Sequence, residues 1–217
     1  MSAAAAVPRA RPGESTLDVY RDDGPLARAL GRVLGVRLSL PPVALVTVGA
    51  LPLFAAIAIE GSGASDALVA AAIGWLVLIA GASSGRPQED RLRWAAIPVL
   101  RLAEYAAVLW IGALAGGSGP AAAFALLAAV AFRQYDLVYR LRYQGTPPRW
   151  LGDVAGGWEG RLVVAWVLLA ADAVPAGFFA LAVALGLLFV GESAYSWARV
   201  RRADAVVEYE DEEAGEE

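Results

Sequence analysis

The stretch WAAIPVLRLAEYAAVLWIGALAGGSGPAAAFALLAAVAFRQYDLVYR, residues 94–140, decides the fold. It contains two apolar runs, separated by the short connection GGSGP, and each run is long enough to cross a bilayer as a helix. Each run also holds one Arg-x-x-acid pair, Arg101 with Glu104 and Arg133 with Asp136. Charge is costly at that depth, so such groups are either paired or functional. The stretch predicts two adjacent antiparallel membrane helices with a charged cluster between them.

The composition of the whole chain supports a membrane protein. Of the 217 residues, 58% are apolar and only 18% are charged, and much of that charge lies near the two ends. A soluble domain of this length is about a quarter charged. The chain has no cysteine and no histidine, which excludes disulfides, thiol nucleophiles, imidazole catalysis and Cys/His metal sites. We therefore expect no metal site and no cofactor.

Hydropathy predicts an all-α membrane protein, a bundle of six transmembrane helices. We expect the spans near residues 41–59, 67–84, 94–115, 120–140, 158–174 and 177–198. The last two could be read as one long element. However, Asp172, Pro175 and Gly177 predict a tight turn, and about 36 helical residues would reach roughly 54 Å, too far for one crossing.

The arginines predict the orientation of the bundle. All 18 basic residues are arginine, and 16 of them fall before the first span, in the second–third and fourth–fifth connections, or after the last span. Arginine marks the cytoplasmic side. Both termini are therefore expected in the cytoplasm of a bacterial cell, with the chain crossing the plasma membrane an even number of times. The two remaining arginines are Arg101 and Arg133.

The ends of the chain differ from its middle. Residues 1–16 are small, Pro-containing and aperiodic, which predicts disorder without a cleaved signal peptide. Residues 17–40 are expected to form an amphipathic helix at the membrane interface, with Leu26, Leu30 and Leu34 on its apolar face. Residues 41–198 form the membrane domain. Residues 199–217 carry the acidic sequence EYEDEEAGEE and are expected to be a disordered, solvated tail or a contact for a basic partner.

The intramembrane charges are predicted to lie at similar depth. At a rise of about 1.5 Å per residue, Arg101, Glu104, Arg133, Asp136 and Glu192 all fall in the cytoplasmic half of the bundle. Arginine and acid three residues apart share a helix face, so each pair can partly neutralise itself. Glu192 then needs another partner, and we expect Arg140, Arg161 or a proton.

Two interpretations of these charges remain open. One is a structural polar network that fixes helix packing. The other is a cytoplasm-facing pocket that binds an anion, since arginine suits two-point binding of phosphate. The candidate residues for such a pocket are Arg101, Glu104, Arg133, Asp136, Tyr139, Arg140, Glu159, Arg161 and Glu192.

Two further motifs bear on function. The sequence DGPLAR at 23–28 matches part of the CDP-alcohol phosphatidyltransferase signature, but Tyr20 stands where that signature has an aspartate, and residues 36–58 contain none. We interpret it as a helix cap and charged turn. The segment GDVAGGWEGR at 152–161 is Gly-rich but lacks the features of a phosphate loop. It is expected to be a flexible cytoplasmic loop, or a loop that folds over the charged site with Trp158, Glu159 and Arg161.

Several stretches of the chain resemble a known family. RDDGPLARALGR, ASSGRP, LRLAEY, AFRQYDLVYRLRYQGTPPRWLG and GWEGR occur in this order over most of residues 20–198. Together they resemble an uncharacterised actinobacterial integral-membrane domain that often lies C-terminal to a CDP-alcohol phosphatidyltransferase domain. The resemblance implies a link to phospholipid metabolism and a separately encoded partner enzyme, but no activity.

Three functions are therefore weighed. The first is a non-catalytic membrane module that uses the Arg/acid pocket to bind or organise a phospholipid-synthesis enzyme or its anionic lipid. The second is an enzyme of lipid-linked phosphate chemistry, with Asp136 or Glu104 as base and Arg133, Arg101 and Arg140 as a phosphate clamp. The third is a small transporter of an anionic solute. No nucleic-acid partner is expected.

Overall fold

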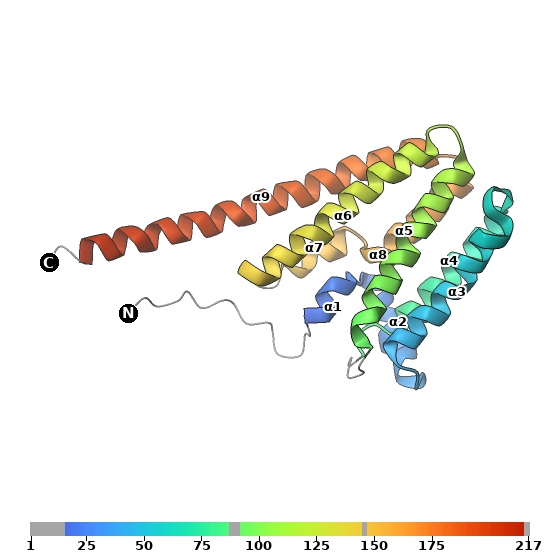
Figure 1. Cartoon of the computed structure of the whole chain (residues 1–217), viewed down its shortest axis with the longest axis horizontal. Coiled ribbons are helices and arrows are strands. Elements are labelled where there is room, and N and C mark those ends of the chain that lie inside the picture. Colours follow the sequence, from blue (N-terminus) through green and yellow to red (C-terminus); the bar gives the residue numbers. More distant parts are fainter. Residues whose placement is uncertain (1–15, 87–91, 145–146, 215–217) are drawn as a thin grey trace.

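The computed structural model describes residues 16–86, 92–144 and 147–214, and over that part of the chain it contains helices and no strands (Figure 1). The prediction of an all-α protein is confirmed. The helices are α1 Thr16–Arg21, α2 Pro25–Leu34, α3 Pro42–Glu60, α4 Asp66–Gly81, α5 Ala96–Ala115, α6 Gly119–Tyr143, α7 Arg149–Val154, α8 Gly157–Ala170 and α9 Val174–Ala214.

Among the described residues, four helical stretches are long and apolar enough to cross a membrane, by length and composition. They are Pro42–Gly63, Ala96–Ala115, Gly119–Tyr143 and Val174–Val200. Two further helices occupy the positions of predicted spans but are shorter, α4 with 16 residues and α8 with 14. At about 1.5 Å per residue these rise roughly 24 and 21 Å, less than a hydrocarbon core of about 30 Å. Length thus supports four of the six predicted spans.

Side-chain contacts fix the directions of α3, α4 and α5. The Trp110 indole, near the end of α5, donates to the carbonyl oxygen of Gly61, directly after α3, at 2.7 Å. The ends of α3 and α5 therefore lie together, so these helices run in the same direction. Between them the chain returns along α4, where Gly49 of α3 packs closely on Ala80 and the Trp75 indole donates to the Val48 carbonyl.

Helices α6 and α9 form a second packed pair, which extends away from α3 and α4 in Figure 1. The turn predicted at Asp172 separates α8 from α9, and Asp172 adopts a left-handed conformation with φ 52°. Gly177 then allows a close approach of Leu168, whose Cδ2 lies 2.4 Å from where a Cβ would be. Helix α9 continues to Ala214. Residues 199–214 are therefore helical in the structure, whereas the sequence predicts a disordered tail.

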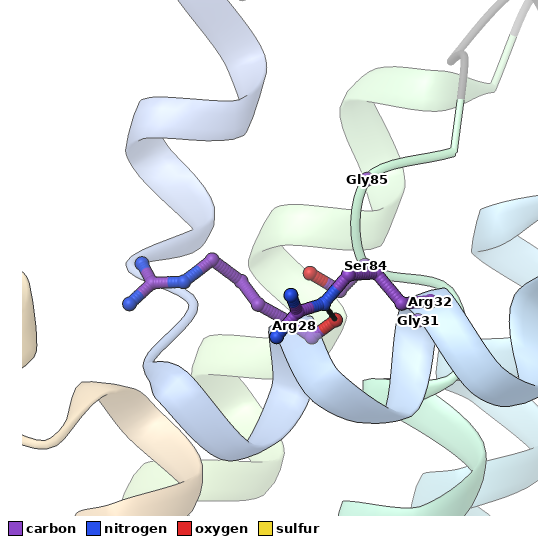
Figure 2. A pocket seen from close by; sticks show the side chains of 5 residues that line it. All are labelled: Arg28, Gly31, Arg32, Ser84 and Gly85. Carbon is purple, nitrogen blue, oxygen red and sulfur yellow. Dashed lines mark hydrogen bonds between the residues drawn. The ribbon is translucent and has the colours of Figure 1, made fainter.

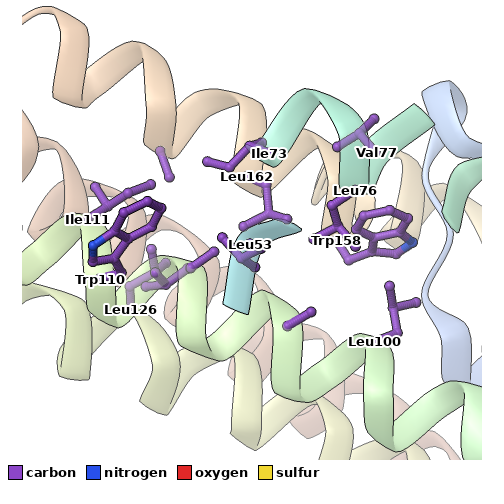
Figure 3. Close-up of a cluster of buried hydrophobic side chains, with 14 of the residues drawn as sticks. Leu53, Ile73, Leu76, Val77, Leu100, Trp110, Ile111, Leu126, Trp158 and Leu162 are labelled. Atoms are coloured by element: carbon purple, nitrogen blue, oxygen red, sulfur yellow. The ribbon is translucent and has the colours of Figure 1, made fainter. Parts of the chain in front are cut away.

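The core lies between α3, α4, α5, α6 and α8, and small residues let these helices pack closely. Figure 3 shows its large side chains, including Leu53, Leu76, Leu126 and Trp158, all at most 1% exposed. By contrast, Ile59 and Leu187 on the outside are 79% and 72% exposed. Large apolar side chains on the outer faces of long apolar helices are the arrangement expected in lipid.

The N-terminal segment differs from the predicted interfacial helix. Instead of one helix over 17–40, α1 and α2 are separated at Asp22, which has φ 52°. Ala27 and Gly31 are buried, and a Cβ on Gly31 would lie 2.2 Å from the Ser84 carbonyl oxygen at the end of α4. The segment is therefore built into the bundle, because its break directs Arg21 and Asp22 into the core. The division of the chain into segments that end at residues 16, 40 and 198 stays a prediction. Residues 1–15 lie outside the described part of the chain.

Candidate functional site

Five charged side chains from four segments form a continuous chain of ion pairs, which we call the buried ion network. Arg101 pairs with Glu104 within α5, and Glu104 Oε1 also accepts from Nε of Arg161 in α8, at 2.8 Å. Arg161 Nη1 reaches Asp22 Oδ2 at 3.0 Å. Arg133 of α6 completes the network, with Nη2 2.8 Å from Asp22 Oδ1. The order of charges is Arg101, Glu104, Arg161, Asp22, Arg133.

The network is sealed from solvent. Each of its five residues is at most 9% exposed, and Glu104 is 1% exposed. It holds three arginines and two carboxylates, and backbone oxygens engage part of the excess positive charge, because Arg101 also donates to the carbonyls of Tyr20 and Arg21. Arg133 lies over the Phe189 ring, 5.0 Å from its centroid, which joins the network to α9.

Asp22 is the central carboxylate. Burial alone would raise the pKa of Asp22, but the guanidinium groups of Arg161 and Arg133 outweigh burial and lower it from 3.8 to about 2. The carboxylate is therefore charged at neutral pH, as its two arginine partners require. The main chain holds it in place as well, since the Asp22 carbonyl accepts from the Trp158 amide at 3.2 Å.

The neighbouring Asp23 belongs to a second set of contacts. Its carboxylate accepts from the Trp158 indole at 2.8 Å and from Arg21 Nε at 3.0 Å. Arg21 Nη2 continues to the Ala80 carbonyl of α4, at 3.3 Å. Among the described residues no group of three His, Cys, Asp or Glu side chains could hold a metal ion. The contacts of Asp23 make the DGPLAR segment a charged turn at the start of α2, as the sequence indicates.

Glu159 caps a helix that lies far away in the sequence. Its carboxylate accepts from the amides of Gly24 at 3.1 Å and Ala27 at 3.0 Å, at the start of α2. Free amides and the helix dipole make a helix start favourable for a carboxylate. Gly157 permits the approach, because it has φ 63° and a Cβ there would lie 2.2 Å from the Gly24 nitrogen. Residues 157–161 therefore pack against the charged site as helix rather than as a flexible loop.

A second cluster joins α6 to α9, and we call it the α6–α9 seam. Arg140 Nε lies 2.6 Å from Asp136, and Arg140 Nη2 lies 2.5 Å from Glu192 of α9. Ser193 donates to Asp136 at 2.6 Å. One turn further along, Ser196 donates to the Gln144 side-chain oxygen. The seam therefore places one arginine between two carboxylates on neighbouring helices.

The nine predicted site residues thus divide into several places. Arg101, Glu104, Arg133 and Arg161 belong to the buried ion network, and Asp136, Arg140 and Glu192 to the seam. Glu159 caps α2, and Tyr139 lies outside both clusters, in a row of exposed tyrosines with Tyr135 and Tyr143.

Two expected pairings are present, whereas the expected Arg133–Asp136 pairing is not formed. The Arg101–Glu104 pair is present, and Glu192 pairs with Arg140, one of its three expected partners. The single cluster expected between RLAE and RQYD is not formed, because Arg133 turns to Asp22 and Asp136 to Arg140. Sequence reasoning missed Asp22 as a site residue. The signal was the doublet Asp22-Asp23 before Gly24, since aspartate and glycine both favour left-handed turns that interrupt a helix.

The comparisons with known proteins give a family and no function. A family model described as a family of unknown function (DUF5941) matches residues 12–217. The search of the curated proteins and the search of the solved structures found no match.

Proposed function

Because the chain belongs to this family of unknown function, we propose its function from its own geometry: a non-catalytic membrane module whose buried charges hold the bundle together. Its cytoplasmic face binds anionic phospholipid and a phospholipid-synthesis enzyme. The burial of the ion network is the main support for a non-catalytic role. Each of its five residues is at most 9% exposed and is paired with a residue of opposite charge.

The enzyme alternative lacks an available base. A general base must reach the proton it removes, directly or through one water. Glu104 is bound by two arginines and is 1% exposed. Asp136 is held by Arg140 and by the Ser193 hydroxyl. The arginines that would clamp a phosphate are paired as well. Arg101 pairs with Glu104, Arg140 with Asp136, and Arg133 with Asp22, which favours a role in helix packing over catalysis.

The proposed topology is six crossings with both termini in the cytoplasm. The parallel course of α3 and α5 requires a return between them, and α4 provides it. In the same way, α8 leads from the buried ion network to the turn from which α9 comes back to the seam. Short spans can be accommodated by local thinning of the bilayer.

The absence of cysteine makes this topology directly testable. Single variants Ser39→Cys, Ser62→Cys and Ser118→Cys place a thiol at an exposed position in three connections. A membrane-impermeant maleimide applied to intact cells should label Cys at 62 and 118 and leave 39 unlabelled until the cells are opened. Labelling of all three from one side would disprove the six-crossing arrangement.

The structural role of the network is tested with Arg133→Gln against Arg142→Gln, an exposed arginine on the same helix. Arg133→Gln should lower the thermal unfolding temperature in detergent while native mass spectrometry shows the same lipids retained by the folded protein. Arg142→Gln should change neither. Loss of a retained lipid at unchanged stability would restore the pocket interpretation of Arg133 and overturn the proposal.

The partner enzyme is a separate part of the proposal and follows from the resemblance to domains found beside CDP-alcohol phosphatidyltransferases. A phosphatidyltransferase encoded by the same genome, reconstituted with the chain in nanodiscs, should form a complex of defined stoichiometry in native mass spectrometry. If the two proteins remain separate at all ratios, the partner is not this class of enzyme.

A further inference from the structure

A pocket beside α2 shares no residue with the buried ion network. It lies between α2 and the turn that follows α4, and Arg28, Gly31, Arg32, Ser84 and Gly85 line it (Figure 2). Its volume is about 410 Å³, within the range of small-ligand sites. None of these five residues was predicted as a site residue.

The two arginines of the pocket are engaged differently. The Arg28 guanidinium pairs with Asp153 of α7 and donates to the Asp23 carbonyl at 2.9 Å. Arg32 folds back along α2 and donates from Nε to the Arg28 carbonyl at 3.3 Å, as Figure 2 shows. Among the described residues no carboxylate lies within ion-pair distance of Arg32. Within the described part of the chain, Arg32 therefore has donors that no carboxylate engages, and Arg28 adds positive potential beside it.

Small residues form the floor of the pocket. Gly31 rests directly on the Ser84 backbone, since a Cβ there would lie 2.2 Å from the Ser84 carbonyl oxygen. Gly85 follows in the left-handed conformation, φ 70°, with open space where a side chain would stand. A compact ligand can therefore approach the backbone of this turn without meeting a side chain.

We propose that this pocket binds a phosphate group, carried by a phospholipid headgroup or free in the cytoplasm. Arginine presents planar, paired donors that match phosphate oxygens, and its weak contact to the Arg28 carbonyl is easily exchanged for a charged acceptor. The exposed apolar residues Leu26 and Val33, on another face of α2, bring this helix to the lipid surface. The inference rests on the proposed membrane function and adds the site and ligand class.

The test compares wild type with Arg32→Gln, and Arg142→Gln serves as the matched exposed control. Purified protein is titrated with phosphatidylglycerol, with phosphatidylcholine and with inorganic phosphate, and binding is followed by native mass spectrometry. Arg32→Gln should weaken binding of phosphatidylglycerol by about fivefold, the effect of one exposed charged contact, while Arg142→Gln should not. Circular dichroism should show that both variants are folded.

The three probes distinguish the sources of phosphate. Competition of phosphatidylglycerol by inorganic phosphate supports a phosphate site open to both sources, and a response to inorganic phosphate alone assigns the soluble source. Equal binding by wild type and Arg32→Gln in every titration overturns the inference. That result would leave the Arg133→Gln stability test untouched, so failure of this site is distinguishable from failure of the module itself.

Discussion

Replacement of Asp22 by Asn should be the most damaging conservative change in the chain. The carboxylate accepts from Arg133 Nη2 at 2.8 Å and Arg161 Nη1 at 3.0 Å, and all three residues are buried. Asn keeps the size of the side chain but removes the charge shared by two arginines. Removal of one partner from a buried ion pair costs about 3–5 kcal/mol, because the remaining charge is left uncompensated. For a protein of this size, that corresponds to a fall of about 6–20 °C in unfolding temperature.

The assay is thermal unfolding in detergent, followed by circular dichroism and by the fluorescence of the tryptophans. The matched control is Asp153→Asn, since Asp153 also pairs with an arginine but is 46% exposed at its side chain. That exposed pair should contribute at most about 1 kcal/mol. In a double-mutant cycle, Arg133→Gln added to Asp22→Asn should cost less than the sum of the two single changes. Equal unfolding temperatures for Asp22→Asn and Asp153→Asn would refute the assignment of Asp22 as the central anion.

Three further predictions concern the same end of the bundle. The pKa of Asp22 is lowered to about 2 in the folded protein, so its contribution to stability is present above about pH 4 and is lost as the pH falls towards 2. The difference in stability between wild type and Asp22→Asn should shrink over that interval, and a constant difference would contradict the lowered pKa. Gly157→Ala should lower the free energy of unfolding by about 3 kcal/mol or more, because Gly157 has φ 63° and a Cβ there would lie 2.2 Å from the Gly24 nitrogen. Gly160→Ala should be tolerated, because a Cβ there meets open space, and the unfolding temperatures of the two variants test the difference. Glu159→Gln should weaken the cap of α2 by about 1–2 kcal/mol, seen as faster hydrogen exchange of the first α2 amides, and unchanged exchange would rule out the cap.

Local patterns in the sequence predict the helices well. Apolar runs identify the long helices, and the turn at Asp172 appears where its residues indicate. The Arg101–Glu104 pair also follows from spacing alone, since residues three apart share a helix face. These features depend on neighbours in the chain, which is why one sequence is enough to find them.

Partners from distant segments could not be predicted in this way. Arg133 and Asp136 have the same spacing as Arg101 and Glu104, yet Arg133 pairs with Asp22, 111 residues away in the chain. The spacing rule identifies a possible partner, whereas the packing of α1 and α2 against α5 and α8 decides which carboxylate is used. The sequence predicts one continuous helix in the N-terminal segment because its leucines are periodic. Its break at Asp22, which places two charged residues in the core, depends on backbone conformation that periodicity does not report.

The cap that Glu159 provides for α2 has a consequence for biosynthesis. The two partners are separated by 135 residues, so the ribosome makes α2 long before the carboxylate that completes it. Until α8 has been made, Asp22 lacks its Arg161 partner, and the first amides of α2 lack their acceptor. Part of the contacts that hold the segment translated first can therefore form only after α8 has been made. A chain that lacked α8 would leave Asp22 without Arg161 and the first α2 amides without Glu159.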